Sequence, residues 1–386
     1  MQLPVYLDNN STTPVDPRVL EAMLPYFTQQ FGNAASRTHA FGWAASEAVE
    51  QARQQLASLI NAHPKEIVFT SGATESVNLA LKGVYEAYNS KGNHIITVAT
   101  EHKAVLDTCK HLEKLGAVIT HLSVNNEGLI NIDELESNIK PSTILIAVMY
   151  ANNEIGVIQP IQKIAAIARK HNILFFCDAA QAAGKIPVDV IKDDISLLSF
   201  SAHKMYGPKG VGALYVRRKD PRAKIIAQMD GGGHENNMRS GTLNVPAIVG
   251  FGKACELSIM EMNNETERLY ALRNRFENAL MQLDNVFING NAQQRLPHVT
   301  NLYFEGVSAN RLLTGFSKSI AASSGSACTS ALVEPSYVLK ALGMGDERAN
   351  NSLRFGLGRF TDDEQVEYAV KIIAENVCKL RKELHC

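Results

Sequence analysis

Ser199-Phe200-Ser201-Ala202-His203-Lys204 closes an apolar run near the middle of the chain, and Gly207-Pro208-Lys209-Gly210 follows it. A strand does not continue through an adjacent glycine and proline, so the pattern predicts that Lys204 lies just past the end of a strand. Upstream, Phe175-Phe176-Cys177-Asp178 ends another apolar run with a carboxylate. The sequence therefore indicates an acid and a lysine at the ends of two strands.

An acid and a lysine in this arrangement are what pyridoxal 5'-phosphate (PLP) requires. The lysine binds the aldehyde as a Schiff base, and the acid keeps the pyridine nitrogen protonated so that the ring withdraws electrons. Most single lysines and aspartates have simpler roles. In that case Lys204 would be an ordinary loop lysine and Asp178 a helix cap. Lys204 and Asp178 alone leave the two interpretations equally open.

Apolar runs of strand length alternate with helical patterns over much of the chain. The strand candidates are residues 66–70, 94–99, 117–122, 143–149, 173–177, 196–200 and 212–216, and the helical patterns include 74–88 and 161–171. Such alternation predicts an α/β fold with a mostly parallel sheet flanked by helices on both faces. Ligands of these sheets bind beyond the carboxyl ends of the strands, where Asp178 and Lys204 are expected.

The two ends of the chain follow a different pattern. Helical patterns at residues 265–283 and 361–384 bracket short strand candidates at 299–304, 320–323 and 353–356. We therefore predict a large domain over residues 16–258 and a smaller α+β domain formed by residues 1–15 and 259–386.

Composition and charge exclude several classes of partner. The 386 residues carry a formal net charge of −1 without a strongly charged block, so neither nucleic acid nor an anionic membrane is expected as a main partner. The longest apolar run, residues 144–151, is far too short to cross a bilayer, and the first residues carry no signal-peptide pattern. Six cysteines form no Cys-x-x-Cys motif, which argues against a disulfide framework or a permanent metal site and favours a cytoplasmic location.

Residues 70–76, Thr-Ser-Gly-Ala-Thr-Glu-Ser, follow a strand candidate and open a helical pattern. Free backbone N–H groups at a helix start favour a phosphate, and the hydroxyls add donors. A serine or threonine helix cap is the better interpretation of this segment alone. Ser201 and His203, next to Lys204, make the phosphate site the favoured interpretation.

Three more residues follow strand candidates at the same predicted edge. His102 is suited to lie on a pyridine ring, although a surface histidine is the commoner case. Asn152 is suited to a ring hydroxyl, although Asn152-Asn153 is equally a turn signal. Gln181, three residues after Asp178, is suited to contact the same ring oxygen.

Cys328 lies among small polar residues in Ser323-Ser324-Gly325-Ser326-Ala327-Cys328-Thr329-Ser330. This setting favours an exposed nucleophilic thiol over an inert loop cysteine, because the neighbours offer little apolar packing. Arg354 is a lone charge in an apolar strand candidate. Its planar guanidinium suits a carboxylate, and a surface-facing arginine is an equally good explanation.

Together these motifs resemble the cysteine desulfurases of the NifS/IscS type, group I, which are class V aminotransferase-like PLP enzymes. The resemblance covers nearly the whole chain. Its landmarks are residues 6–10, 31–33, 71–76, 100–102, 152–156, 178–181, 201–204, 231–242, 323–330 and 334–337. It implies the PLP-dependent transferase fold of type I. Two features depart from the usual pattern: Ala34 replaces a proline after Asn33, and the chain has a shorter carboxy-terminal end than housekeeping members.

The resemblance implies a role for each candidate residue. Cys328, Lys204 and His102 are catalytic, and Arg354 and Asn33 bind the substrate carboxylate. The cofactor-binding residues are Ala73, Thr74, His102, Asn152, Asp178, Gln181, Ser201, His203, Lys204 and, from the other subunit, Thr242. Cys328 takes sulfur from L-cysteine as a persulfide and leaves L-alanine; no permanent metal is implied beyond a transient iron–sulfur contact through Cys328.

The resemblance also implies a homodimer that delivers sulfur to acceptor proteins, such as an iron–sulfur cluster scaffold. A PLP aminotransferase or a selenocysteine lyase of the same fold is the alternative among enzymes. A transaminase needs no thiol, so the segment around Cys328 argues against it. A catalytically silent partner protein is the alternative outside enzymes, and intact Lys204 and Cys328 argue against that.

Overall fold

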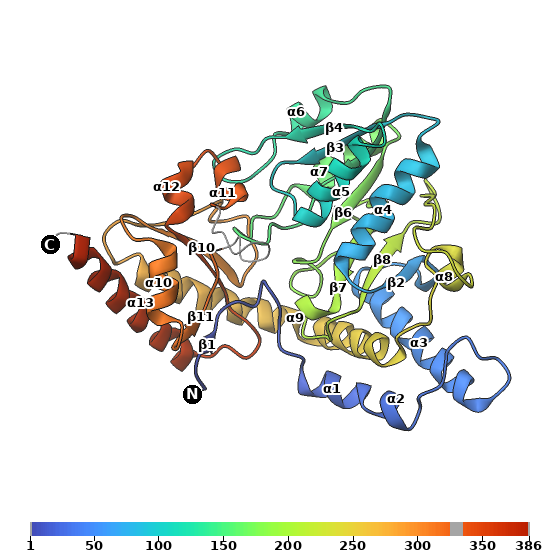
Figure 1. The fold of residues 1–386 in the computed structure, drawn as a ribbon, viewed down its shortest axis with the longest axis horizontal. Helices are drawn as coiled ribbons and strands as arrows, with labels where there is room; N and C mark the ends of the chain where they lie inside the picture. The colour runs from blue at the N-terminus through green and yellow to red at the C-terminus, as the bar shows by residue number, and fades with distance from the viewer. Residues whose placement is uncertain (1, 325–334, 385–386) are drawn as a thin grey trace.

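The computed structural model describes residues 2–324 and 335–384, and in this part of the chain a seven-stranded sheet forms the centre of the larger domain (Figure 1). Its strand order is β2-β8-β7-β6-β5-β3-β4. The strands are β2 (Ile67–Thr70), β3 (His94–Val98), β4 (Val118–Leu122), β5 (Thr143–Ala147), β6 (Leu174–Asp178), β7 (Leu197–Ser201) and β8 (Gly212–Val216). The predicted strands are therefore all present, with ends that differ by one or two residues.

Strand direction confirms the prediction of a mostly parallel sheet. The neighbours β4, β3, β5, β6 and β7 are parallel, with partners such as Phe176 and Leu197 in register. β8 is antiparallel to both β7 and β2. The carboxyl ends of β3, β5, β6 and β7 consequently lie along one edge of the sheet.

Helices cover both faces of this sheet. Because alternate residues of a strand point to opposite faces, Phe176 of β6 packs in one apolar cluster and Phe175 in another. The first cluster includes residues of α4 (Ala73–Tyr88) and α5 (Lys103–Glu113). The second includes residues of α3 (Ala40–Leu59), α7 (Ile161–Lys170) and α9 (Val245–Leu280). The large domain thus has three layers, as the alternating pattern predicted.

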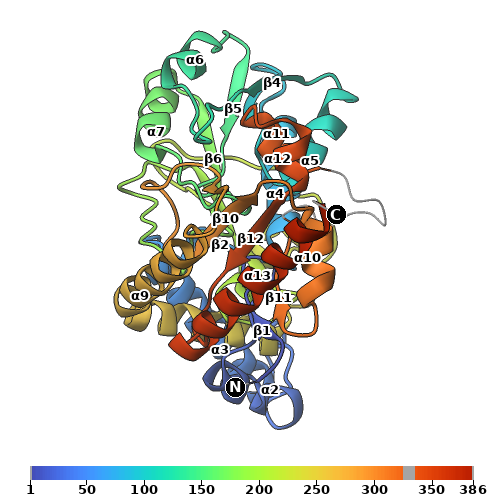
Figure 2. The ribbon, with the colours of Figure 1, turned by 90° about the vertical axis from the view of Figure 1, so that its left-hand side faces the viewer.

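The smaller domain lies at the left of Figure 1. Its antiparallel sheet has the order β12-β10-β9, and β1 pairs with β11 beside it. The elements are β1 (Val5–Tyr6), β9 (Val286–Ile288), β10 (Val299–Phe304), β11 (Ile320–Ala321), β12 (Ser352–Gly356), α10 (Ala309–Phe316), α11 (Tyr337–Ala341), α12 (Gly345–Asn350) and α13 (Asp363–Leu384). Figure 2 shows α13 across the front of this domain.

The helix α9 runs through both domains. It begins at Val245, so the prediction of a helix starting at residue 265 was wrong about its start. Leu257 packs in the core of the large domain, whereas Leu269 packs with Val5, Leu7 and the small-domain strands. The predicted boundary at residue 258 therefore falls inside a continuous helix. The two apolar cores are joined by this helix rather than by a linker.

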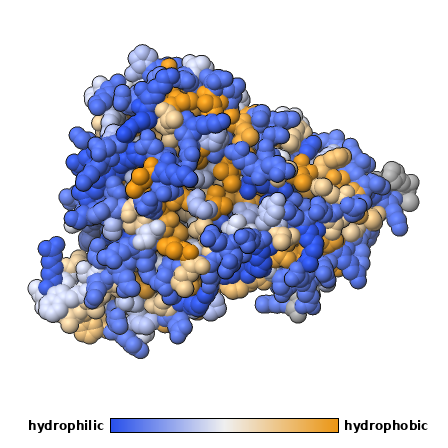
Figure 3. Space-filling view, turned by 180° about the vertical axis from the view of Figure 1, so that it is seen from behind, coloured by the Kyte–Doolittle hydropathy of each residue, from blue (hydrophilic) through white to orange (hydrophobic). Residues whose placement is uncertain are grey.

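The remaining elements complete the large domain. They are α1 (Pro17–Met23), α2 (Pro25–Thr28), α6 (Ile132–Ser137), α8 (His234–Asn237) and the 3-10 turns η1 (Pro64–Glu66) and η2 (Ala202–Lys204). In the described part of the chain, none of the helices combines the length and apolar character that a membrane span needs. The reverse face of the molecule is largely hydrophilic, with apolar residues in scattered patches (Figure 3).

Candidate active site at the carboxyl ends of the strands

Lys204 ends the short turn η2, directly after β7. Its Nζ donates hydrogen bonds to the backbone oxygens of Asn10 (2.6 Å) and Ser11 (2.7 Å). The backbone then reverses through Tyr206, whose φ of 64° lies in the left-handed region. The prediction that Lys204 lies just past a strand end is confirmed, and its amino group is directed toward the N-terminal segment.

Asp178 and His102 lie at the same edge of the sheet. Asp178 ends β6 and is buried, and its Oδ1 accepts hydrogen bonds from Ser199 Oγ (3.1 Å) and the Ala180 N–H (3.0 Å). His102 is the N-cap of α5, where its Nδ1 accepts the Ala104 N–H (3.1 Å). Burial lowers the pKa of His102, although the charge of Asp178 opposes this shift. The imidazole is therefore neutral at neutral pH and is not a simple surface group.

The segment between β2 and α4 has the geometry of an anion site. The N-cap of α4 is Gly72, and among the described residues no side chain caps this helix. Thr70 Oγ1 instead bonds Ser76 Oγ (2.8 Å) and accepts the Gly72 N–H (3.3 Å). The alternative of a serine or threonine cap is therefore wrong. The first N–H groups of a helix have no partner within the helix, and in α4 these include the N–H groups of Ala73 and Thr74.

Ser201 lies beside this helix start, and His203 lies two residues further along the chain. A Cβ added to Gly72 would lie 3.9 Å from Ser201 Oγ, which places this hydroxyl next to the start of α4. The Nδ1 of His203 is 3.2 Å from Thr12 Oγ1. Burial, with the charges of Lys204 and Lys209, lowers the pKa of His203 to about 4. This histidine can accept or donate a hydrogen bond as a neutral ring without adding charge.

Asn152 and Gln181 make different contacts. Asn152 Oδ1 accepts the backbone N–H groups of Glu154 (2.8 Å) and Ile155 (3.0 Å), and its Nδ2 donates to the Thr100 oxygen (3.0 Å). Asn152 therefore stabilises a turn, as the alternative interpretation of Asn152-Asn153 as a turn signal predicted. Gln181 Nε2 donates to the backbone oxygen of Asn10 (3.0 Å), which brings Gln181 to the acceptor that Lys204 uses.

Arg354 lies on β12 and is only 3% exposed, so the alternative of a surface-facing arginine is wrong. Its guanidinium donates to Asp8 Oδ1 (2.7 Å), Ser11 Oγ (2.7 Å) and the Asn153 oxygen (3.1 Å). Its Nε is buried and has no hydrogen-bond partner among the described residues. A buried, unsatisfied guanidinium donor is a group that a carboxylate ligand would satisfy.

The N-terminal segment, residues 8–13, is the part of the site that sequence reasoning missed. Asp8 and Ser11 contact Arg354, and Asn10 contacts both Lys204 and Gln181. These contacts join residues more than a hundred positions apart, and no local pattern signals them. Residues 6–10 were a landmark of the family resemblance, but no role was assigned to them.

Two candidates lie apart from this group, and a third is not among the described residues. Asn33 and Thr242 are exposed, and Asn33 Oδ1 accepts the N–H of Ala35 (2.9 Å). The α2–α3 connection that carries Asn33 lies far from β10 and its sheet in both views (Figures 1 and 2). A single chain therefore does not bring Asn33 to Arg354. Cys328 lies outside the described residues.

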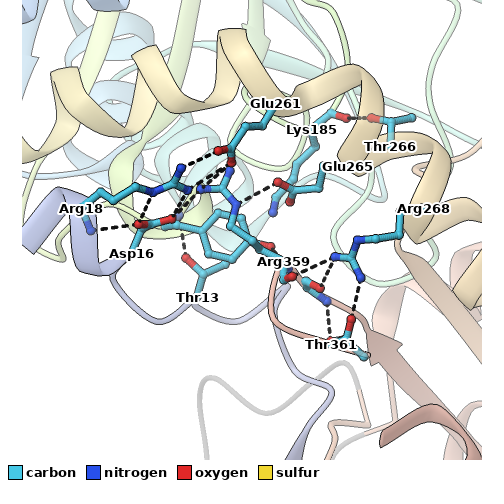
Figure 4. Close-up of polar contacts among 12 residues, drawn as sticks. Thr13, Asp16, Arg18, Lys185, Glu261, Glu265, Thr266, Arg268, Arg359 and Thr361 are labelled. Carbon is cyan, nitrogen blue, oxygen red and sulfur yellow. Dashed lines mark hydrogen bonds and ion pairs between the residues drawn. The ribbon is translucent and has the colours of Figure 1, made fainter. Parts of the chain in front are cut away.

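Figure 4 shows an ionic cluster in which the side chains of Arg359, Asp16 and Glu265 are largely buried. The Arg359 guanidinium donates to Asp16 Oδ2 (2.8 Å) and Glu265 Oε2 (2.9 Å), and its backbone N–H donates to the Tyr206 hydroxyl (2.6 Å). Hydrogen bonds from Arg18 and Arg359 hold the pKa of Asp16 well below its usual range, against the effect of burial. The cluster ties the loop after β12 to α9 and to the segment after η2.

Comparison with known proteins agrees with this geometry. The family described as "Aminotransferase class-V" matches residues 5–369. A protein named cysteine desulfurase IscS, from Anaeromyxobacter dehalogenans (strain 2CP-C), is 55% identical over 383 residues, which are 99% of this chain and 94% of that protein.

Solved structures give the same result. A NifS-like protein superposes with a TM-score of 0.90 at 37% identity, covering 97% of this chain and 99% of that one. A structure titled "SspA in complex with cysteine" gives 0.83 at 37% identity, covering 92% and 99%. The resemblance seen in the sequence is confirmed, and the chain belongs to the class-V aminotransferase family, among the cysteine desulfurases of the NifS and IscS type.

Proposed function

We propose that the protein is a PLP-dependent cysteine desulfurase that takes sulfur from L-cysteine, releases L-alanine and holds the sulfur as a persulfide on Cys328. The observation that carries this proposal is the meeting of Lys204 and Arg354 at Ser11. A lysine for the cofactor and a guanidinium for an amino-acid carboxylate thus contact the same residue. The desulfurase relatives support the choice of substrate.

The residues at the strand ends fit PLP. The phosphate would bind the uncapped start of α4 through Ala73 and Thr74, with Ser201 and His203 beside it. His102 and the buried Asp178 would hold the ring, with Asp178 keeping its nitrogen protonated, and Asn152 and Gln181 would contact its side. When bound, PLP supplies an electron sink for the substrate α-carbon.

The chain's own residues supply the rest of the reaction. Arg354 orients the substrate carboxylate, and Lys204 moves protons at the α- and β-carbons. The Cys328 thiolate forms an S–S bond with the substrate sulfur as the Cβ–S bond breaks. The electron pair of that bond stays on carbon, which takes up a proton and becomes the methyl group of alanine. Overall, a thiol and cysteine give a persulfide and alanine, and no external oxidant is required.

The direct test is to mix the PLP-loaded protein with L-cysteine and a reductant. Alanine and sulfide should appear in equal amounts. Formation of a keto acid without sulfide would identify an aminotransferase instead. Activity with selenocysteine but none with cysteine would identify a selenocysteine lyase.

Arg354→Lys is expected to weaken cysteine binding by roughly 1.5–3 kcal/mol, the usual worth of a charged hydrogen bond. Lysine keeps the charge but loses the planar fork, which contacts Asp8, Ser11 and Asn153 through two of its nitrogens. PLP content should stay unchanged because Arg354 contacts no residue of the proposed phosphate site. Titration of the cofactor absorbance with cysteine measures the affinity. An unaltered affinity would show that the carboxylate binds elsewhere.

We also propose that the protein is a homodimer in which Thr242 and Asn33 complete the partner's site. Large apolar side chains are exposed at the α1–α3 end: Leu24 (55%), Phe27 (57%), Phe31 (64%), Phe41 (49%) and Trp43 (58%). This end, at the lower left of Figure 3, is pale to orange. A cavity of about 450 Å³ beside it is lined by residues 34–37 and 232–234. The segments that lead to Asn33 and Thr242 therefore meet next to the exposed apolar patch.

Light scattering should give the mass of two chains at micromolar concentration. Phe27→Asp combined with Trp43→Glu should produce monomers that bind PLP at least about tenfold more weakly, because charges disrupt an apolar interface. Met260→Glu is the matched control, since Met260 is 70% exposed but lies on α9, outside this patch. A parent protein that is a stable monomer with full PLP occupancy would refute the dimer.

The sulfur acceptor is proposed by class. An iron–sulfur cluster scaffold is the expected partner, and a cytoplasmic location is the expected compartment. The described cysteines Cys109, Cys177, Cys255 and Cys378 are free thiols. In the described residues no group of three or more histidine, cysteine or acidic side chains is placed to hold a metal ion. Persulfide transfer to a purified scaffold protein, followed by mass spectrometry, tests the acceptor.

A further inference from the structure

The helix α11 docks on the turn that follows β5. Val338 and Leu339 of α11 pack in a small apolar cluster with Ile155 and Val157. This cluster is separate from the three larger apolar clusters of the molecule. The first helix after residues 325–334, α11, therefore packs on the large domain through this cluster.

Polar contacts fix the first residues of this docked segment. Ser336 Oγ donates to Glu154 Oε2 at 2.5 Å, and the Tyr337 hydroxyl donates to the backbone oxygen of Glu101 at 2.7 Å. The Lys103 Nζ lies over the Tyr337 ring, 4.7 Å from its centroid. Glu154 is only 1% exposed, so its hydrogen bond to Ser336 is shielded from water.

The same turn also holds the substrate-binding arginine. Asn153, next to Glu154, accepts a hydrogen bond from Arg354 through its backbone oxygen at 3.1 Å. On the other side of residues 325–334, Ser323 pairs with the backbone of Arg354, with N···O distances of 2.7 and 3.3 Å. The residues on both described sides of this segment are therefore connected to Arg354. Ser323 pairs with the backbone of Arg354 on β12. Ser336 binds Glu154, which follows the residue whose backbone oxygen accepts from the Arg354 guanidinium.

We propose that Glu154 is a positioning residue for sulfur transfer, which acts by holding Ser336 and thereby fixing where the segment that carries Cys328 rejoins the large domain. The proposal rests on the proposed function, since that assigns Cys328 as the sulfur acceptor. Glu154 touches neither substrate nor cofactor in this scheme. It matters because a displacement of about 1 Å in a reacting group can slow a reaction about a hundredfold.

The test separates two steps in one turnover. Rapid mixing of the PLP-loaded enzyme with L-cysteine reports substrate binding as a change in the cofactor absorbance. Acid quenching followed by mass spectrometry reports the persulfide on Cys328. Glu154→Leu removes the acceptor of Ser336 but leaves the bond from the Leu339 N–H to Ser336 Oγ (3.2 Å), which caps α11. Glu154→Gln retains an acceptor oxygen and is the conservative control.

Glu154→Leu should bind cysteine within about twofold of the parent rate and form the persulfide about tenfold more slowly. Glu154→Gln should recover most of the persulfide rate. Equal slowing of both steps, slowing of neither, or a glutamine variant as slow as the leucine variant would overturn the proposal. A parent enzyme that forms no persulfide on Cys328 would instead refute the proposed function.

A second variant keeps the proposal testable if Glu154→Leu does not fold. Ser336→Ala removes the donor that Glu154 accepts and leaves Glu154 in place. Tyr85→Phe is the control, because it removes a hydroxyl that donates to the Leu115 oxygen at 3.0 Å, away from this contact. Ser336→Ala should slow persulfide formation about tenfold, as Glu154→Leu does, with Tyr85→Phe unchanged. Persulfide formation by Ser336→Ala at the parent rate would overturn the proposal.

Discussion

Cys328→Ser is expected to retain PLP and to lower the catalytic release of alanine by more than about a thousandfold. A serine hydroxyl is a poor nucleophile toward sulfur and is not ionised near neutrality, whereas a thiol is partly thiolate there. The serine variant should still change its cofactor absorbance when cysteine is added. Mass spectrometry of the parent after cysteine treatment, without reductant, should show one added sulfur on the peptide that carries Cys328.

The described cysteines provide the controls for this experiment. Burial raises the pKa of Cys109 to about 12 and raises the pKa values of Cys177 and Cys255 well above the usual range. These thiols are poor nucleophiles in the folded protein. Cys378 is exposed on α13, so Cys378→Ser is the matched control and should turn over normally. A persulfide on another cysteine, or normal turnover by Cys328→Ser, would show that Cys328 is not the sulfur acceptor.

Lys204→Ala is expected to abolish the absorbance of covalently held cofactor and to reduce turnover by more than about a thousandfold. The fold should persist, because Lys204 ends a short 3-10 turn and belongs to neither of the two apolar cores that α9 joins. Some PLP should still bind without a covalent link, through the uncapped start of α4. Absorbance spectra and thermal unfolding check the two parts of this expectation.

The exposed Lys209 is the control for Lys204. It lies five positions further along the chain, and Lys209→Ala removes a nearby charge without removing the lysine at the strand end. This variant should keep its covalent cofactor and most of its turnover. Alanine production by Lys204→Ala at the parent rate would show that another residue binds the cofactor.

The sequence predicted the residues that strand order brings together. Asp178, His102 and Lys204 each follow a parallel strand, and parallel strands end at one edge, so their proximity follows from local patterns alone. The contacts of Asp8 with Arg354 and of Asn10 with Lys204 could not be predicted from local patterns. They depend on the path of the N-terminal segment between the two domains. No hydrophobic period or turn signal encodes such a route.

The early start of α9 was missed for a different reason. Gly250 and Gly252 interrupt the helical pattern near its beginning, and glycine lowers helix propensity. The structure explains Gly252: an added Cβ would lie 2.7 Å from the Cα of Ala52 in α3. The close approach of the two helices requires glycine there, and packing compensates for the lost propensity. The antiparallel direction of β8 was missed because an apolar run carries no direction.

Because α9 is continuous, the number of residues in it between the two cores determines how the two domains are placed relative to each other. Leu257 belongs to one core and Leu269 to the other, with unbroken helix between them. One residue added or removed in that interval would turn one core against the other by about 100° and shift it by about 1.5 Å. Lys204 of the large domain and Arg354 of the small domain would then lose their shared contact with Ser11. The number of residues between Leu257 and Leu269 is therefore constrained more tightly than the identity of those residues.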